Sequence, residues 1–216
     1  MINTAPPVQY YDNKYFDWQK SIGEFGGWAN KTKFSAFISK NDDVLDFGCG
    51  GGFLLANLEC KKKIGIEINP SAAETAKEKG FEIYRFLDDC PDNYVDIIIS
   101  NNALEHTHHP LDELKKLYSK LRKNGKIIFV VPCENISYEY KPNDINQHLY
   151  SWSPMGIGNL FTLAGFSIIE SKPYIHKWPP NYLKIAKYGR RFFDISCRIY
   201  GRVKREWFQV RIIAVK

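Results

Sequence analysis

The sequence predicts an α/β fold in which helices cover both faces of a mostly parallel β-sheet. After residue 43, short apolar runs alternate with segments of helical periodicity, and parallel strands need crossover connections of this kind. A glycine-rich turn, residues 48–52, follows the first apolar run directly. The 216 residues are enough for a full hydrophobic core, and we expect a single domain.

The first half of the chain supplies four strands and two helices. The expected strands are residues 44–47, 64–68, 82–86 and 95–101. A run of isoleucines indicates that the last of these is buried on both faces. One helix is expected to begin at Phe53, directly after the glycines. A second is expected over residues 69–80, because Asn69 suits an N-cap, and a proline and a glycine stand at its start and end.

The second half continues the alternation and then departs from it. Leucines at helical spacing predict a helix over residues 110–125. The remaining expected elements are a strand over 126–132, a helix over 153–165 and two closing strands over 166–171 and 207–215. The predicted organisation is an N-terminal lid (1–40), a core (41–172), a basic helical insertion (173–206) and a last strand (207–216).

Composition limits the class of protein. No run approaches the roughly 20 apolar residues that a membrane span needs, and the first residues lack the pattern of a secretion signal. The five cysteines include no C-x-x-C pair, which argues against a disulfide framework and a zinc site. The expected location is therefore the cytoplasm. The net charge of +6 is concentrated near the end, since residues 184–216 hold ten Lys or Arg and two acids.

The glycine-rich turn reads V-L-D-F-G-C-G-G-G over residues 44–52. A dinucleotide-binding turn needs a third small residue where this chain has Phe53, and a Walker A loop needs Gly-Lys-Ser/Thr at its end. Asp46 stands two residues before the first glycine, at the carboxyl end of the strand. Its charge would repel a pyrophosphate and favour a ligand with an ammonium or sulfonium group. The turn therefore predicts S-adenosylmethionine as the ligand.

Four stretches together resemble the class I S-adenosylmethionine-dependent methyltransferase family. They are residues 44–52, 65–69, 96–106 and 121–132. The resemblance implies a Rossmann-like, doubly wound, seven-stranded sheet with an antiparallel final strand. It also implies an enzyme that takes its methyl group from S-adenosylmethionine. In that family the carboxylate that matches Glu67 accepts hydrogen bonds from the two ribose hydroxyls.

The residues expected to hold the cofactor are Asp46, Gly48, Cys49, Gly50, Glu67, Ile68, Leu87, Asp88, Asn101 and Trp28. Adenine is expected between Ile68 and the loop that follows the third strand, where Asp88 is either a ligand contact or a surface acid. The stretch containing Phe25, Gly27, Trp28 and Asn30 is either a lid over the site or packing for the first helix.

Two polar segments predict the acceptor side of the site. His148 is the candidate general base, because a histidine with a pKa near 6.5 can remove a hydroxyl proton at neutral pH. The alternative is that His148 holds its loop in place by hydrogen bonds to the backbone. The residue matching His106 lies at the floor of the acceptor pocket in similar methyltransferases, often as a structural hydrogen-bonder. The residues expected to line the pocket are Tyr150, Trp152 and Asn102. No metal is expected, since no acid partner completes a site with the histidines of residues 106–109.

The expected substrate is a small molecule. Enzymes that methylate amines of nucleic-acid bases carry [N/D]-P-P-[Y/F] where this chain reads N-N-A-L, residues 101–104. Similar sequences with H-x-Y-x-W-[S/T]-P, here residues 148–154, occur among methyltransferases of sugar and natural-product pathways. We therefore expect methyl transfer to a hydroxyl of a sugar or glycoconjugate precursor. The alternatives are an NAD(P)-dependent oxidoreductase and a non-catalytic module that binds RNA or a membrane.

The basic insertion carries apolar residues at helical steps of three or four. They are Ile185, Tyr188, Phe192, Ile195, Ile199 and Val203. The first interpretation is a helix that packs this face on the edge of the sheet. The second is a helix that rests on anionic lipid or holds a phosphate-bearing acceptor such as a nucleotide-linked or lipid-linked sugar. The third is RNA binding, although no RNA-binding module accompanies the helix.

Overall fold

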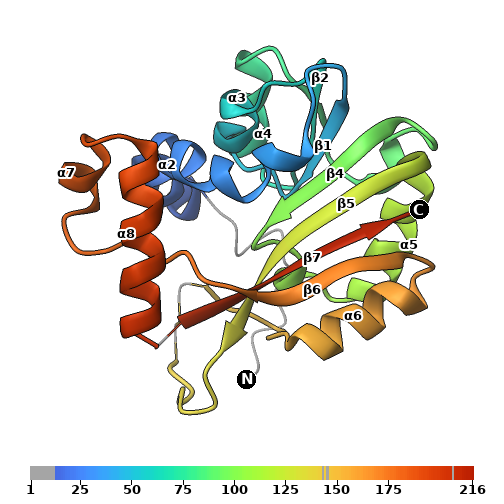
Figure 1. The fold of residues 1–216 in the computed structure, drawn as a ribbon. Coiled ribbons are helices and arrows are strands. Elements are labelled where there is room, and N and C mark those ends of the chain that lie inside the picture. Colours follow the sequence, from blue (N-terminus) through green and yellow to red (C-terminus); the bar gives the residue numbers. More distant parts are fainter. Residues whose placement is uncertain (1–12, 143, 145, 206) are drawn as a thin grey trace. The chain divides into compact units, whose positions relative to one another are not determined.

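A computed structural model describes residues 13–142, 144, 146–205 and 207–216 (Figure 1). Its seven strands form one sheet in the order β3-β2-β1-β4-β5-β7-β6. The strands are β1 (Asp43–Phe47), β2 (Lys62–Ile66), β3 (Glu82–Tyr84), β4 (Val95–Asn101), β5 (Leu121–Glu134), β6 (Ser167–Tyr174) and β7 (Trp207–Val215). Strand β1 runs parallel to β2 and β4, β2 runs parallel to β3, and β6 and β7 are antiparallel. The predicted α/β fold with an antiparallel last strand is confirmed.

The chain divides into two compact units, which are described separately. The described residues of unit 1 are 13–100 and 116–126, and those of unit 2 are 101–115 and 127–216 without the gaps named above. Unit 1 contains strands β1 to β3, nearly all of β4, and the helices α2 (Asn13–Asn30), α3 (Phe53–Asn57) and α4 (Pro70–Glu78). Its core includes Val44, Leu45, Ile64 and the isoleucines of β4.

The glycines of α2 let this helix approach α3 closely. A Cβ atom on Gly23 would collide with the Phe53 ring, and one on Gly27 would collide with the Phe53 backbone. Helix α3 begins directly after the glycine-rich turn. The glycines of the N-terminal stretch therefore serve helix packing next to that turn.

Helix α4 begins as its sequence predicts. The side chain of Asn69 accepts hydrogen bonds from the backbone N–H groups of Ser71 and Ala72, at 2.9 and 3.1 Å. Pro70 occupies the first turn, where its missing N–H costs nothing. The predicted N-cap is confirmed.

Helix α5 (Pro110–Lys120) ends five residues earlier than the predicted residue 125. Asn124 has φ 63°, which a helix does not accommodate. The Arg122 guanidinium binds Asp43 and Asp96, each at 2.8 Å. This ion-pair cluster holds the segment in the extended conformation with which β5 begins.

Unit 2 contains the rest of β5, strands β6 and β7, and helix α6 (Pro154–Leu163). The basic insertion forms two helices, α7 (Tyr182–Ala186) and α8 (Arg190–Val203). They are separated at Gly189, whose φ of 96° breaks a continuous helix. Figure 1 shows both helices between the end of β6 and the start of β7.

Candidate functional site

The glycine-rich turn of unit 1 alternates left-handed residues. Gly48, Gly50 and Gly52 have φ values of 75°, 54° and 72°, a region that favours glycine. The N–H groups of Gly48 and Cys49 both donate to the Ile66 carbonyl, at 3.0 and 3.1 Å. Gly52 was not among the site residues predicted from the sequence, although its position just before a helix could have indicated it. A Cβ atom there would lie 2.9 Å from the Phe81 ring.

Cys49 is part of this turn, and its side chain packs against β2. Its side chain is buried, and a Cβ atom on Gly65 of β2 would collide with its sulfur. Burial, followed by the charges of Asp46 and Glu67, raises the pKa of the Cys49 thiol. Cys49 therefore fills space as a protonated thiol.

Glu67 follows β2 and braces the glycine-rich turn. Its Oε2 accepts the Gly50 N–H and its Oε1 accepts the Asn69 N–H, both at 2.8 Å. Burial raises the pKa of Glu67 despite these hydrogen bonds, which act in the opposite direction. Because each carboxylate oxygen has two lone pairs, both oxygens can also accept a hydroxyl group.

Asp46 is buried within β1. Burial, followed by the charge of Glu67, raises its pKa well above the ordinary range of an aspartate. A cation bound nearby would stabilise the ionised form and oppose that shift. The structure thus brings together Asp46, Cys49, Gly50 and Glu67, as the sequence predicts.

The other residues predicted for the cofactor lie in four places. Leu87 is buried in the short 3-10 turn η3 (Leu87–Asp89), whereas the exposed Asp88 carboxylate lies 2.6 Å from Lys116 Nζ. Trp28 is in α2, its ring centroid 5.5 Å from that of Phe25. Ile68 is half-buried between Glu67 and Asn69, and Asn101 is the half-buried last residue of β4.

Asn102 of unit 2 is held at its backbone and side chain. Its N–H donates to the Val130 carbonyl at 2.8 Å, and its Oδ1 accepts from Gln209 Nε2 at 2.9 Å. Its φ is 57°, in the left-handed region that asparagine tolerates. No sequence pattern predicts this contact with the buried Gln209, which lies 107 positions away.

A histidine cluster forms in unit 2 from segments 42 residues apart. The Leu149 N–H donates to the Glu105 carbonyl at 3.0 Å and ties one segment to the other. The ring centroids of His106 and His148 are 5.1 Å apart in an edge contact. Both Nε2 atoms lie 3.9 Å from Oε1 of Glu105, which is fully buried. The sequence predicts the two histidines but not Glu105.

Glu134 determines the orientation of His148. Its Oε1 lies 2.7 Å from His148 Nδ1. A carboxylate only accepts hydrogen bonds, so in the neutral imidazole Nδ1 carries the proton and Nε2 has the lone pair. Burial, followed by the nearby His148, lowers the pKa of His106 to about 4. His106 is therefore uncharged at neutral pH.

The same cluster has the composition of a cation site. Glu105, His106 and His148 offer ligand atoms that all lie within 4.8 Å of one another. The prediction that no acid partner completes a site with the histidines is therefore wrong, because Glu105 lies beside His106 and His148. The Nε2 lone pair of His148 can serve either as a ligand or as an acceptor of a substrate proton.

Tyr150 and Trp152 form a stacked pair, with centroids 5.3 Å apart and planes at 17°. The Tyr150 hydroxyl donates to the His108 carbonyl at 3.2 Å, and the Trp152 backbone N–H donates to the Pro132 carbonyl at 3.0 Å. The buried Trp152 indole N–H meets no hydrogen-bond acceptor among the described residues. Since buried donors are normally paired, this group is suited to a ligand oxygen.

A family model described as a methyltransferase domain matches residues 22–171. The chain belongs to the methyltransferase domain family. S-adenosylmethionine is the methyl donor typical of this family. The match spans both the glycine-rich turn and the histidine cluster.

Two curated proteins are similar to part of this methyltransferase domain. An uncharacterized methyltransferase, C70.08c, of Schizosaccharomyces pombe is 31% identical over 110 residues, which cover 44% of this chain and 41% of that protein. A ribosomal protein L11 methyltransferase of Burkholderia mallei is 34% identical over 110 residues, 46% of this chain and 33% of that protein. The matches thus span less than half of the length of each of these relatives.

Solved structures share the fold of the methyltransferase domain. A methyltransferase from Thermotoga maritima, titled a possible histamine N-methyltransferase, has a TM-score of 0.67 at 18% identity. The match covers 98% of this chain and all of that chain. Phosphoethanolamine N-methyltransferase 2 of Haemonchus contortus has a TM-score of 0.69 at 14% identity, over 99% of this chain and 61% of that chain. At these identities the likeness shows the fold alone.

Proposed function

We propose that this chain transfers the methyl group of S-adenosylmethionine to a hydroxyl group of a small molecule, a sugar or glycoconjugate precursor. The observation that carries the proposal is the Glu67 carboxylate, which braces the left-handed glycine turn beside the buried Asp46. This arrangement suits a ligand with ribose hydroxyls and a positive charge, and it does not suit a pyrophosphate.

On this proposal, unit 1 holds the methyl donor. Glu67 accepts hydrogen bonds from the ribose hydroxyls, and Asp46 stabilises the positive charge of the amino-acid portion. Helix α2 supplies the cover, because it packs on α3 immediately after the glycine-rich turn. Trp28 lies in the last turns of that helix, and Leu87 and Ile68 supply apolar contacts to adenine.

Unit 2 supplies the acceptor side. His148 Nε2 removes the proton of the acceptor hydroxyl, and Glu134 stabilises the imidazolium that forms. The neutral His106 serves as a hydrogen-bonding floor, with Asn102 beside the pocket. The sulfonium is already activated, so most of the rate comes from aligning oxygen, methyl carbon and sulfur and from excluding water.

Two features support a sugar-like acceptor. The stacked Tyr150 and Trp152 present aromatic surface with polar tips, which suits a ring that has both C–H and hydroxyl groups. The basic residues of α7 and α8 would favour an acceptor that carries phosphate, such as a nucleotide-linked or lipid-linked sugar. We also propose a cytoplasmic location, as the sequence predicts.

Calorimetric titration with S-adenosylhomocysteine tests the donor half of the proposal. We expect the wild-type chain to bind it, and Glu67→Ala to weaken binding about 10- to 100-fold, because hydrogen bonds to a charged group are lost. Glu78→Gln, an exposed carboxylate on α4, is the matched control and should bind normally. Binding of NADH in place of S-adenosylhomocysteine would instead support an oxidoreductase.

A further inference from the structure

One face of helix α8 is already packed against the rest of unit 2. The buried residues of this face are Phe193, Cys197 and Gly201. A Cβ atom on Gly201 would lie 2.6 Å from Ile175, so the helix approaches that segment closely. Asp194 Oδ1 lies 3.0 Å from His176 Nε2. These contacts fix the rotation of α8 about its axis.

The opposite face of α8 is apolar and exposed. Phe192, Ile195, Ile199 and Val203 are 53, 54, 58 and 73% exposed, and their spacing places them on one side of the helix. Tyr188, 78% exposed, extends the row, with its ring centroid 5.7 Å from that of Phe192. We call these five residues the apolar stripe. The interpretation that this face packs on the sheet edge is wrong, because the other face of α8 makes the contacts.

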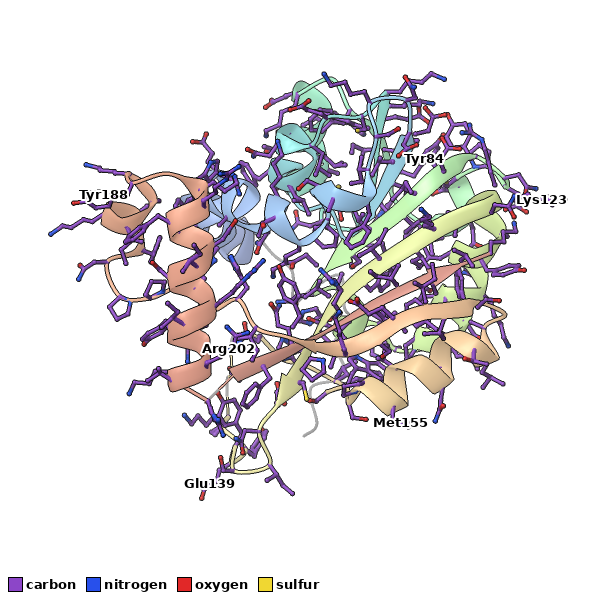
Figure 2. All side chains as sticks on the ribbon, in the orientation of Figure 1. Tyr84, Lys123, Glu139, Met155, Tyr188 and Arg202 are labelled. Carbon is purple, nitrogen blue, oxygen red and sulfur yellow. The ribbon has the colours of Figure 1, made fainter. Side chains whose placement is uncertain are left out.

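Basic side chains flank the apolar stripe. Arg191, Arg198 and Arg202 are exposed and lie seven and four residues apart, which places them in a row along the helix. Further exposed basic residues are Lys184, Lys187, Lys204 and Arg205. Residues 182–205 contain eight Lys or Arg and one acid, Asp194. Figure 2 labels Tyr188 and Arg202, which mark the two ends of this surface.

We propose that α7 and α8 dock on an anionic lipid bilayer, with the apolar stripe inserted among the acyl chains and the arginine row at the headgroups. A helix with a contiguous apolar face and a strongly basic flank lies in the plane of a membrane interface. Anionic headgroups attract each nearby Lys or Arg. No helix in the described ranges is long and apolar enough to cross a membrane. This inference stands independently of the proposed function.

Other occupants fit the surface less well. RNA would engage the arginine row but would leave four large aliphatic or aromatic side chains of α8 in water. A second copy of the chain would bring together two surfaces that each carry eight Lys or Arg and one acid, and this repulsion between like charges opposes association. A bilayer satisfies the apolar stripe and the basic flank at once.

Vesicle flotation tests the proposal with the whole 216-residue chain. We expect it to float with vesicles of phosphatidylcholine and phosphatidylglycerol, to bind pure phosphatidylcholine far less, and to be released by salt. Ile195→Asp with Ile199→Asp should abolish flotation. Replacing Arg191, Arg198 and Arg202 by Gln should lower the affinity for the anionic vesicles about 100-fold.

Two control variants separate this surface from general properties of the chain. Met155→Asp with Leu163→Asp changes exposed apolar residues of α6, which are 74 and 68% exposed, and should float normally. Replacing Lys115, Lys123 and Lys126, which are also exposed, by Gln removes the same net charge elsewhere and should bind nearly as wild type. Met155 and Lys123 are labelled in Figure 2. Circular dichroism of each variant establishes that it is folded.

Three results would overturn the proposal. The first is a wild-type chain that does not float with anionic vesicles. The second is equal loss of binding in the control and surface variants. The third is a wild-type dimer that the stripe variant converts to a monomer, since a second copy would then cover the stripe. Tighter binding to a single-stranded RNA than to the anionic vesicles would likewise reject the bilayer as the occupant.

Discussion

At the scale of single residues, Glu134 defines the chemistry available to His148. The 2.7 Å contact between Glu134 Oε1 and His148 Nδ1 favours the Nδ1–H tautomer of the neutral ring. We predict that the imidazole nitrogen chemical shifts of the wild-type chain will show this tautomer. Replacing Glu134 by Leu should leave a mixture of tautomers, because the acceptor for Nδ1–H is lost. His148→Asn assigns the signals. A wild-type spectrum of the Nε2–H form would contradict the role of His148 Nε2 as base.

The Nε2 lone pair of His148 could instead bind a metal ion, and metal analysis tests this use. We predict that the chain purified without a chelating tag contains no stoichiometric metal and that EDTA leaves its binding of S-adenosylhomocysteine unchanged. Stoichiometric zinc that is lost in His148→Ala, but kept in His109→Ala, would reassign Glu105, His106 and His148 as ligands. His109 is an exposed histidine close in sequence, so it controls for adventitious binding.

His106 makes stability depend on pH. Its pKa is about 4 in the folded chain against an ordinary 6.5, so the unfolded chain takes up a proton at pH values where folded His106 does not. The free energy of unfolding should therefore fall as the pH drops from about 6.5 to 4, by up to about 3 kcal/mol from this residue. Urea titrations across this range measure it. His106→Asn should flatten the dependence, and His109→Asn should not.

At the scale of elements, the sequence predicts helix starts and strands better than helix faces. Asn69 and the isoleucines of β4 carried local signals that the structure confirms. The predicted end of α5 was wrong, because Arg122 forms ion pairs with residues distant in the chain, and these oppose the helix that the leucine periodicity predicts. Helix α8 has apolar residues on two faces, with Phe193 inside and Phe192 outside, so periodicity alone could not identify the packed face.

The close contact between α2 and α3 gives an element-scale prediction. Gly27→Ala places a methyl group against the Phe53 backbone, which cannot yield as a side chain would. We expect a loss of about 1–3 kcal/mol in the free energy of unfolding. The control is Gly158→Ala in α6, where the nearest atom to the new Cβ is 3.8 Å away. It should stabilise the chain by up to about 1 kcal/mol, as alanine favours helix. Equal effects in denaturant titrations would contradict the packing argument.

At the scale of the whole molecule, predictability follows distance along the chain. Asp46, Gly48 and Gly50 lie in one contiguous motif, and Glu67 in the next, so their spacing predicts their joint position. Glu134 and Gln209 acquire their contacts with predicted site residues only through the fold, and no local pattern distinguishes them from ordinary strand residues. Glu105 is next to His106 in the sequence, but only the fold brings it close to His148. The architecture was predictable because the alternation of strands and helices is visible along the whole sequence. Side-chain partners, in contrast, depend on the register of the strands.

Ligand-dependent stability of the whole chain provides the final prediction. A ligand at 100 times its dissociation constant stabilises the folded state by about 2.7 kcal/mol, so S-adenosylhomocysteine should raise the Tm of this 216-residue chain by about 5–10 °C. Asp46→Asn should weaken this ligand at least about tenfold, but not methylthioadenosine, which lacks the charged amino-acid portion.

The pH dependence of that binding follows from the raised pKa of Asp46. Protonation removes the charge that attracts the ammonium group. Affinity for S-adenosylhomocysteine should therefore fall with falling pH, starting at a higher pH than the titration of an ordinary aspartate. Methylthioadenosine should show a weaker dependence. Equal losses of both ligands in Asp46→Asn would mean that Asp46 only shapes the turn, and the charge argument for S-adenosylmethionine would then fail.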